Sequence, residues 1–240
     1  ATLMDAHVAD FRSSFDRADL TLYGSENSHI PTDERIRRMA AGEPDQPLIA
    51  AMFQYGRYLL IASSREDSPL ATHLGGIWND NIYNTIDRPP DLHIDMNLQI
   101  QYWTSGVCSL PECYPPGITS LCDLLVPSGK KTAGEAYGMG GWTAHVVSNP
   151  WGFTALGWSY NWGSWSLGGV WSAILLWDYY KFTRDEAFLR EKGYEVLEGA
   201  ARFVTEYVFY DEQNGYYMTG HRSLLLLPGK VSSADWKILR

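Results

Sequence analysis

The sequence predicts an all-α protein in which successive antiparallel helix pairs form a toroid of helical hairpins, with functional loops at one end. Two observations support this prediction. Apolar residues recur at helical spacing through most of the 240 residues, and helices alternate with loops while almost no segment has the pattern of a strand. A plain helical bundle is the alternative that the same pattern allows.

The first helix is predicted from an amphipathic pattern. Met4, Val8, Phe11 and Phe15 recur at steps of four, three and four residues, and charged residues occupy the other faces of residues 2–18. This segment should therefore place one apolar stripe against the rest of the protein.

Two more helices follow. Residues 31–34, Pro-Thr-Asp-Glu, supply a cap residue and first-turn acids for a helix that continues to about Ala41, before Gly42 and Pro44 stop it. Residues 47–63 are apolar around much of the helical circumference, so we expect this helix to be buried. The Gly, Asn, Asp and Pro residues after it predict a long ordered loop over residues 75–92, and long loops in compact domains are usually functional.

The middle of the chain predicts two helices and one irregular region. Residues 98–110 and 118–138 have helical patterns, and prolines separate them. Residues 138–169 are rich in glycine and tryptophan, so the chain can turn freely there while large rings fill the space. The tryptophans are Trp142, Trp151, Trp158, Trp162 and Trp165.

The last elements are two helices and a hairpin. A helix begins near Val170, and residues 183–186, Thr-Arg-Asp-Glu, predict a capping box that opens the next helix. The apolar stripe of that helix is predicted to contain Leu197, Ala201, Val204 and Val208. Asn214-Gly215 lies between aromatic pairs and predicts a β-hairpin turn.

Composition limits the class of ligand. The formal net charge is −9 and no basic run offsets it, so neither nucleic acid nor an anionic membrane surface is expected to bind. Ten Trp and fifteen Tyr residues are a heavy aromatic load, and aromatic faces bind the C–H faces of sugars as well as packing in cores. No segment has the apolar length to span a bilayer, and the N-terminus has no signal-peptide pattern.

The three cysteines do not predict a metal site. Cys108, Cys113 and Cys122 have neither CxxC spacing nor accompanying histidines, so we expect no zinc. A disulfide between Cys108 and Cys113 remains open at this point.

We expect the functional polar side chains in residues 93–97. If this segment is extended, His93, Asp95 and Asn97 share one side, and the apolar side chains between them, such as Met96, anchor the other. Such a row of polar groups could position a polar ligand and a water. The alternative is a helix start in which Asp95 or Asn97 accepts from the backbone of the following helix.

Several stretches together resemble the catalytic domain of glycoside hydrolase family 95, which is typified by 1,2-α-L-fucosidases. They occur in the family's order and cover nearly all of residues 5–220. The matching stretches are residues 15–17, 31–35, 53–60, 63–65, 76–79, 93–99, 141–142, 144–145, 168–169, 171, 179–183 and 197–200.

The resemblance implies a fold and a reaction. The fold is an (α/α)6 barrel, of which residues 1–240 would form the N-terminal part of a single catalytic domain, incomplete in this chain and with a divergent tail over residues 221–240. The reaction is an inverting hydrolysis of terminal α-L-fucosyl or α-L-galactosyl residues in oligosaccharides or glycans. It implies no cofactor and no metal, and it suggests a secreted location.

The resemblance also implies roles for individual residues. In the His-x-Asn-x-Asn-Leu-Gln motif of the family, Asn97 matches the second amide and His93 a sugar-contacting histidine, but Asp95 replaces the first amide. An ionised carboxylate only accepts hydrogen bonds, so Asp95 could itself act as a base or weaken the site by repelling a second carboxylate. Trp142 and His145 match a Gly-Trp-x-x-His element of the substrate pocket. We therefore expect Asn97 and Asp95 to be catalytic, and His93, Trp142 and His145 to bind the substrate.

One departure from the family leaves two hypotheses. The Ser-Pro-Glu motif that carries the family's general acid is absent, Glu212 is the last glutamate, and Asp235 is the one later carboxylate. The first hypothesis is a fucosidase-like hydrolase, and a separate runner-up is another sugar-active α/α toroid. The second is a truncated chain that binds sugar without turnover. In that case the apolar faces of residues 47–63 and 169–208 would lack partners.

Overall fold

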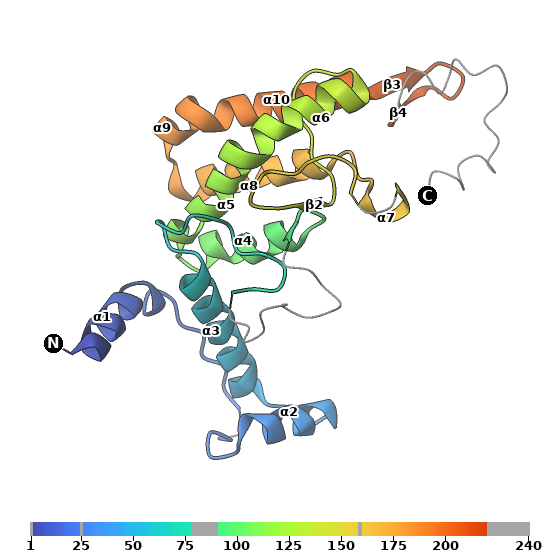
Figure 1. Cartoon of the computed structure of the whole chain (residues 1–240). Helices are drawn as coiled ribbons and strands as arrows, with labels where there is room; N and C mark the ends of the chain where they lie inside the picture. Colours follow the sequence, from blue (N-terminus) through green and yellow to red (C-terminus); the bar gives the residue numbers. More distant parts are fainter. Residues whose placement is uncertain (1, 25, 78–90, 158–159, 220–240) are drawn as a thin grey trace.

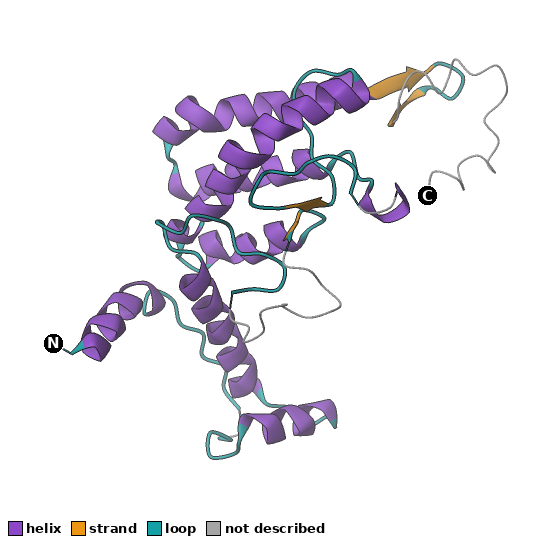
Figure 2. Cartoon of the chain, in the orientation of Figure 1, coloured by secondary structure: helices purple, strands orange, loops and turns teal. Residues whose placement is uncertain are grey.

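The computed structural model describes residues 2–24, 26–77, 91–157 and 160–219, and this part of the chain is all-α with a few short strands (Figures 1 and 2). The predicted fold class is confirmed, and the helix pairs form part of a toroid. The helices are α1 Leu3–Phe15, α2 Thr32–Ala40, α3 Gln46–Ser63, α4 Asn97–Val107, α5 Pro115–Thr119, α6 Val126–Tyr137, α7 Tyr160–Gly163, α8 Gly168–Thr183, α9 Glu186–Phe188 and α10 Tyr194–Tyr207. The strands are β1 Leu92–His93, β2 Val147–Ser148, β3 Val208–Asp211 and β4 Tyr216–Thr219.

Two of these helices are longer than their labels suggest, because π-helical segments join neighbouring elements. Ser120–Leu125 connects α5 to α6, and Leu189–Gly193 connects α9 to α10. A short 3₁₀ turn, Pro111–Cys113, precedes α5. Pro111 therefore separates α4 from the α5–α6 helix as expected, whereas Pro115 and Pro116 form the first turn of that helix.

The helices pack against one another in the order α1, α3, α4, α8 and α10. Helix α8 contacts both α4 and α10, α4 contacts α3, and α3 contacts α1. In Figure 1, α4, α8 and α10 lie one above another, and α3 descends from this stack to α2. No helix within the described ranges is long and apolar enough to cross a bilayer.

The stack of α6, α8 and α10 is held by one tryptophan. The indole of Trp142 is completely buried, and its N–H donates to the carbonyl of Val196 in α10 (2.8 Å). Glycines in all three helices face this ring: a Cβ added at Gly129, Gly169 or Gly199 would lie 3.0, 2.7 or 2.9 Å from an indole carbon. The ring reaches three helix backbones because each has no side chain at the contact.

The joint between α1 and α3 depends on a buried cation. Arg57 of α3 is 2% exposed, and its guanidinium donates to the carbonyls of Phe15 (2.8 Å), Ala18 (2.7 Å) and Ser14 (3.2 Å). It also lies 5.2 Å from the centre of the Phe15 ring. Ser14 and Phe15 end α1 and Ala18 follows shortly after it, so Arg57 joins α3 to the C-terminal end of α1.

The start of α3 is fixed by a buried carboxylate. Asp45 accepts from the backbone N–H of Leu48 (3.0 Å) and from both Nε and Nη2 of Arg35 (2.9 and 2.8 Å). The Arg35 guanidinium holds the pKa of Asp45 well below its ordinary value. Asp45 thereby caps α3 and ties α2 to it.

Helix α3 is not buried as predicted. Leu60 and Ile61 are buried, but Met52 and Tyr55 on the opposite side are each 61% exposed. The prediction was wrong for this side because α1 and α4 cover only part of the helix. The N-terminal half of the α1 stripe is exposed in the same way.

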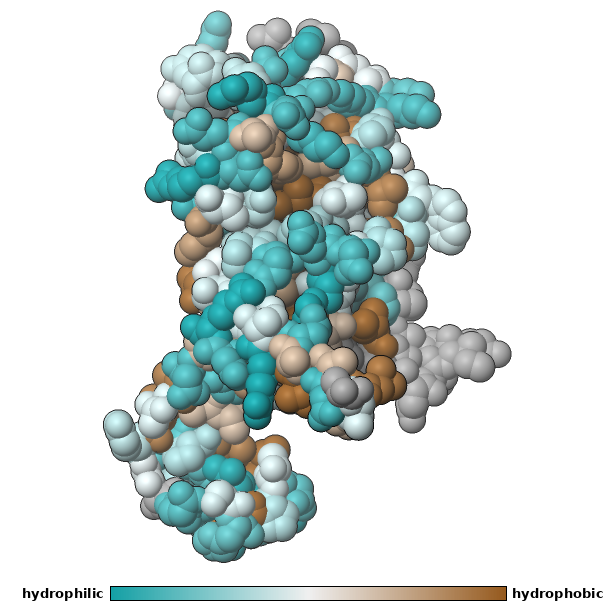
Figure 3. Space-filling model, turned by 90° about the vertical axis from the view of Figure 1, so that its left-hand side faces the viewer, coloured by the Kyte–Doolittle hydropathy of each residue, from teal (hydrophilic) through white to brown (hydrophobic). Residues whose placement is uncertain are grey.

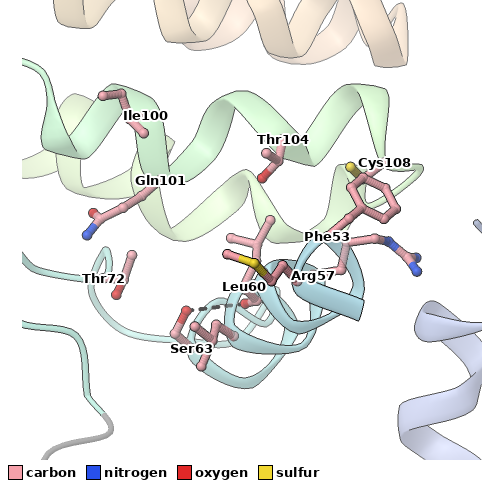
Figure 4. Close-up of a pocket in the computed structure, with 12 residues that line it drawn as sticks. Phe53, Arg57, Leu60, Ser63, Thr72, Ile100, Gln101, Thr104 and Cys108 are labelled. Carbon is pink, nitrogen blue, oxygen red and sulfur yellow. Dashed lines mark hydrogen bonds between the residues drawn. The ribbon is translucent and has the colours of Figure 1, made fainter. Parts of the chain in front are cut away.

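A pocket lies between α3 and α4. Its volume is about 380 Å³, and Figure 4 shows side chains of both helices pointing into it, among them Phe53, Leu60 and Thr104. Hydrophobic patches also interrupt the hydrophilic surface in Figure 3. Both features arise from apolar helix faces that the described residues do not fully cover.

Two predicted helix starts differ from the structure. Pro31 precedes α2 without a side-chain cap. Thr183 belongs to α8, where its hydroxyl donates to the carbonyl of Tyr179 (2.8 Å), and Asp185 is the residue that caps the next helix through the N–H of Phe188 (2.9 Å). The capping box is therefore wrong by two residues, because α8 continues further than expected.

The buried face of α10 is shifted by one residue. Val196, Ala200 and Phe203 are buried, whereas Ala201 of the predicted stripe is exposed. The contact between Gly199 and Trp142 sets this rotation. The predicted hairpin is confirmed, since β3 and β4 pair in antiparallel register around Asn214-Gly215.

The disulfide left open by the sequence does not form. Cys108 and Cys113 are buried free thiols, and Cys122 is a partly buried one. Burial raises the pKa of Cys113 to about 12, so its thiol stays protonated and unreactive at neutral pH.

Gly169→Ala should destabilise the protein. The added Cβ would lie 2.7 Å from both the Trp142 ring and the backbone nitrogen of Ala144, and overpacking of this kind costs about 1–3 kcal/mol. Gly134→Ala is the matched control, because its Cβ would meet nothing within 4 Å in α6 and should stabilise by up to about 1 kcal/mol. Urea unfolding monitored by circular dichroism measures both. Equal effects would contradict the role given to Trp142.

The 240-residue chain should self-associate through the exposed apolar faces of α3 and α8. Tyr55 is 61% and Ile174 48% exposed, and such surfaces attract one another in water. Replacing both with Lys should lower the associated fraction in light scattering after gel filtration. A double variant with the same charge change at exposed polar positions, Glu43→Gln with Glu198→Gln, should not. A sharply melting, monodisperse wild-type monomer would contradict this prediction.

Candidate active site

The candidate site lies where the loops before α4 and α8 meet. Strand β1 pairs with β2, with His93 opposite Val147, and the N–H of Ile94 donates to the carbonyl of Val146 (2.7 Å). The side chain of Gln99, buried in α4, donates to the carbonyl of Ile94 (2.7 Å) and to the hydroxyl of Ser172 in α8 (3.3 Å). The start of α4 is therefore held against the start of α8.

His93 lies between two carboxylates. Its Nδ1 is 2.6 Å from Oδ1 of Asp91, and its Nε2 is 3.1 Å from Oδ1 of Asp95. The side chains of His93 and Asp91 are 10% and 12% exposed, whereas Asp95 is 35% exposed. Asp95 is thus the member of the cluster that a ligand in solvent can reach. Burial raises the pKa of Asp95, and the neighbouring His93 partly offsets this rise.

The extended row of polar groups predicted for residues 93–97 is wrong. The strand ends at His93, the next three residues turn, and α4 begins at Asn97. Met96, expected on the apolar side, is 42% exposed. The helix-start alternative is right about the helix but wrong about the cap, since no side chain caps α4. The turn nevertheless brings Asp95 back to His93 and places partly buried Asn97 next along the chain.

Trp162 is a member of the site that the sequence did not single out. Its ring centre lies 5.3 Å from that of His93, and it is 43% exposed. Asp91 was also missed, although the pattern Asp91-x-His93-x-Asp95 could have indicated it. Trp162 lies in α7, between β2 and α8, and the β1–β2 pairing holds this part of the chain near His93.

Trp142 does not lie at a surface. It is completely buried among α6, α8 and α10, with its N–H bonded to Val196. This placement disagrees with the predicted sugar contact, because no ring atom is accessible to a ligand. Trp142 instead holds the loop that carries β2.

His145 is also completely buried. Its Nδ1 accepts from the backbone N–H of Trp165 (2.9 Å), so in the neutral ring Nε2 carries the proton and donates to the hydroxyl of Tyr137 (3.0 Å). Burial lowers the pKa of His145 to about 4. Both nitrogens are already occupied, so this placement too disagrees with a predicted substrate contact and gives His145 a structural role.

The cluster does not have the form of a metal site. No group of three His, Cys, Asp or Glu side chains within the described ranges could hold a metal ion.

The pocket between α3 and α4 is not lined by His93, Asp95 or Asn97. Residues 78–79, which belong to the resemblance, and residues 220–240, with Asp235, lie outside the described residues.

An all-α partial toroid with histidine, carboxylates and tryptophan at its helix ends defines a structural class, the α/α toroids. Comparison with known families identifies the member of that class. The model of the glycosyl hydrolase family 95 catalytic domain matches residues 1–223, and the chain belongs to this family.

Two curated relatives are similar over most of the chain. Alpha-L-fucosidase 2 of Arabidopsis thaliana is 38% identical over 208 residues, which are 84% of this chain and 24% of the relative. Probable alpha-fucosidase A of Aspergillus niger is 32% identical over 215 residues, which are 88% of this chain and 26% of the relative. The chain therefore spans about a quarter of the length of these relatives.

The buried His145 should make stability depend on pH. Its pKa is about 4 in the folded protein and 6.5 when unperturbed, so the unfolded chain binds the extra proton first as pH falls. The free energy of unfolding should drop by up to about 3 kcal/mol between pH 7 and pH 4 from this group. In urea unfolding, the advantage of wild type over His145→Gln should shrink across this window. His29→Gln, at an exposed site, should follow the wild-type slope, and parallel slopes for all three proteins would contradict the prediction.

Proposed function

We propose that residues 1–240 form the N-terminal part of one catalytic domain of an α-L-fucosidase-type glycoside hydrolase. The substrate would be a terminal α-linked L-fucose, or the closely related L-galactose, on an oligosaccharide or glycan. One observation carries this proposal: the fold brings His93 and Asp95 within 3.1 Å of each other at the common end of α4 and α8. Family membership and relatives named as fucosidases support the same substrate class.

The proposed reaction is an inverting hydrolysis. In such a reaction a carboxylic acid protonates the leaving oxygen, while a carboxylate on the opposite face of the sugar activates a water. Asp95 is proposed as a carboxylate that accepts a proton from this water, because its raised pKa makes it a stronger base once ionised. Asn97 would orient the water through its amide, which can both donate and accept.

The sugar is proposed to bind against His93 and Trp162. The partly exposed Trp162 ring offers an apolar face beside the polar imidazole, a combination suited to the C–H face and the hydroxyls of a sugar. His145 and Trp142 would act at a distance by holding in place the segment between α6 and α8, which carries β2 and Trp162. They are positioning residues in this proposal and not contacts.

A second candidate function is sugar binding without turnover. The observation that favours it is the absence of a Ser-Pro-Glu motif from residues 1–240. Loss of a general acid typically lowers the rate by about 10²–10⁴-fold. Both candidates require that L-fucose binds at His93, so one pair of measurements tests them together.

His93→Ala should weaken binding of L-fucose and 2'-fucosyllactose by about tenfold or more, because a hydrogen bond to a polar ring nitrogen is lost. Isothermal titration calorimetry measures the affinity, and fucose release measures turnover. His29→Ala, in an exposed position far along the chain, should leave both unchanged. Binding without fucose release would select the second candidate. No binding by wild type would overturn both.

A further inference from the structure

We propose that Asp91 is a positioning residue, which fixes the orientation and tautomer of His93 so that Nε2 always faces Asp95 and the incoming sugar. This inference rests on the proposed function for its consequence in sugar binding. Its structural part, the tautomer of His93, can be tested without any sugar.

The geometry around His93 assigns a proton to Nδ1. An ionised carboxylate has no proton to give, so the 2.6 Å contact between Asp91 Oδ1 and His93 Nδ1 requires Nδ1 to donate. The tautomer of a histidine is set by the hydrogen bond that its other nitrogen makes. With Nδ1–H directed at Asp91, Nε2 is the nitrogen presented to Asp95 Oδ1 at 3.1 Å.

Asp91 is suited to this role because it is enclosed and has few other partners. Its side chain is 12% exposed, and Oδ2 is buried with no hydrogen bond to any described residue. The carboxylate thus depends on His93 for its hydrogen bonding. A buried carboxylate with one strong partner holds that partner firmly, since losing the contact would leave the charge unsatisfied.

The other titratable groups near Asp91 do not replace His93. His73 interacts electrostatically with Asp91, but burial lowers its pKa, and its Nδ1 already accepts from the N–H of Gly75 (3.2 Å). Asp95 carries the same charge type as Asp91, so the two carboxylates repel each other across the ring. Trp162 lies against the ring and not against its nitrogens.

The two carboxylates therefore have different roles. Asp91 is enclosed and holds the ring, whereas the more exposed Asp95 shares the opposite nitrogen with solvent and with a ligand. If the ring were free to flip about its Cβ–Cγ bond, Cε1 would take the place of Nε2 at this position. A sugar hydroxyl would then meet a C–H group instead of a nitrogen for part of the time.

The test is the ¹⁵N chemical shift of both ring nitrogens of His93 in the [¹⁵N]histidine-labelled 240-residue chain at pH 8, for wild type, Asp91→Ala and Asp91→Asn. Wild type should show a protonated Nδ1. Asp91→Ala removes the acceptor, so both tautomers should appear and L-fucose affinity should fall by about tenfold. Asp91→Asn keeps an acceptor oxygen and should retain the wild-type tautomer, with affinity within about threefold of wild type. Asp67→Ala, at an exposed site, is the matched control and should change neither.

The outcomes separate this inference from the proposed function. A wild-type His93 whose Nδ1 is unprotonated overturns the inference, even if the Asp91 variants do not fold. A single unchanged tautomer in Asp91→Ala, or an altered tautomer with unchanged affinity, also overturns it. Loss of the tautomer in Asp91→Ala but not in Asp91→Asn supports the structural part, and if wild type then binds no L-fucose, only the proposed function fails.

Discussion

The described structure depends most on the packing of one tryptophan against three glycines. Trp142 lies on a loop, yet its ring touches α6, α8 and α10 at Gly129, Gly169 and Gly199. A large apolar surface is buried at one point, and the indole N–H is satisfied by α10. This contact fixes both the spacing of the helices and the rotation of α10. It also anchors the loop after α6, which carries β2 and leads to Trp162.

The site follows from that anchor. Because the loop after α6 is fixed, β2 can pair with β1 and hold His93 in register. Ile94 can then fill the core beneath His93. His145 adds a neutral, fully bonded link between Tyr137 and the backbone of Trp165. The groups proposed to meet the substrate are therefore supported by apolar packing and by hydrogen bonds that remain neutral near pH 7. Rigid support of this kind is what a site that positions a water requires.

The carboxylates around His93 distinguish this site from the family motif, which has an amide at the position of Asp95. Asp95 stands where the resemblance places an amide, and the structure brings its carboxylate to the imidazole of His93. The enclosed Asp91 lies at the other nitrogen, so one ring is held between two acceptors. Proton positions are consequently coupled across three side chains within five residues of sequence. A change at either carboxylate alters what His93 can offer to a ligand.

The sequence by itself determined the helices, the hairpin at Asn214-Gly215 and the family, because helical spacing, turn chemistry and ordered motifs are local properties of the chain. It also pointed to His93, Asp95 and Asn97, since these lie within one short segment. Only the tertiary structure decided that Trp142 and His145 are buried, that Asp91 and Trp162 join the site, and that α10 turns by one residue. Each of these depends on contacts between segments far apart in sequence. Periodicity describes a helix face, but the neighbour that covers the face is chosen by packing.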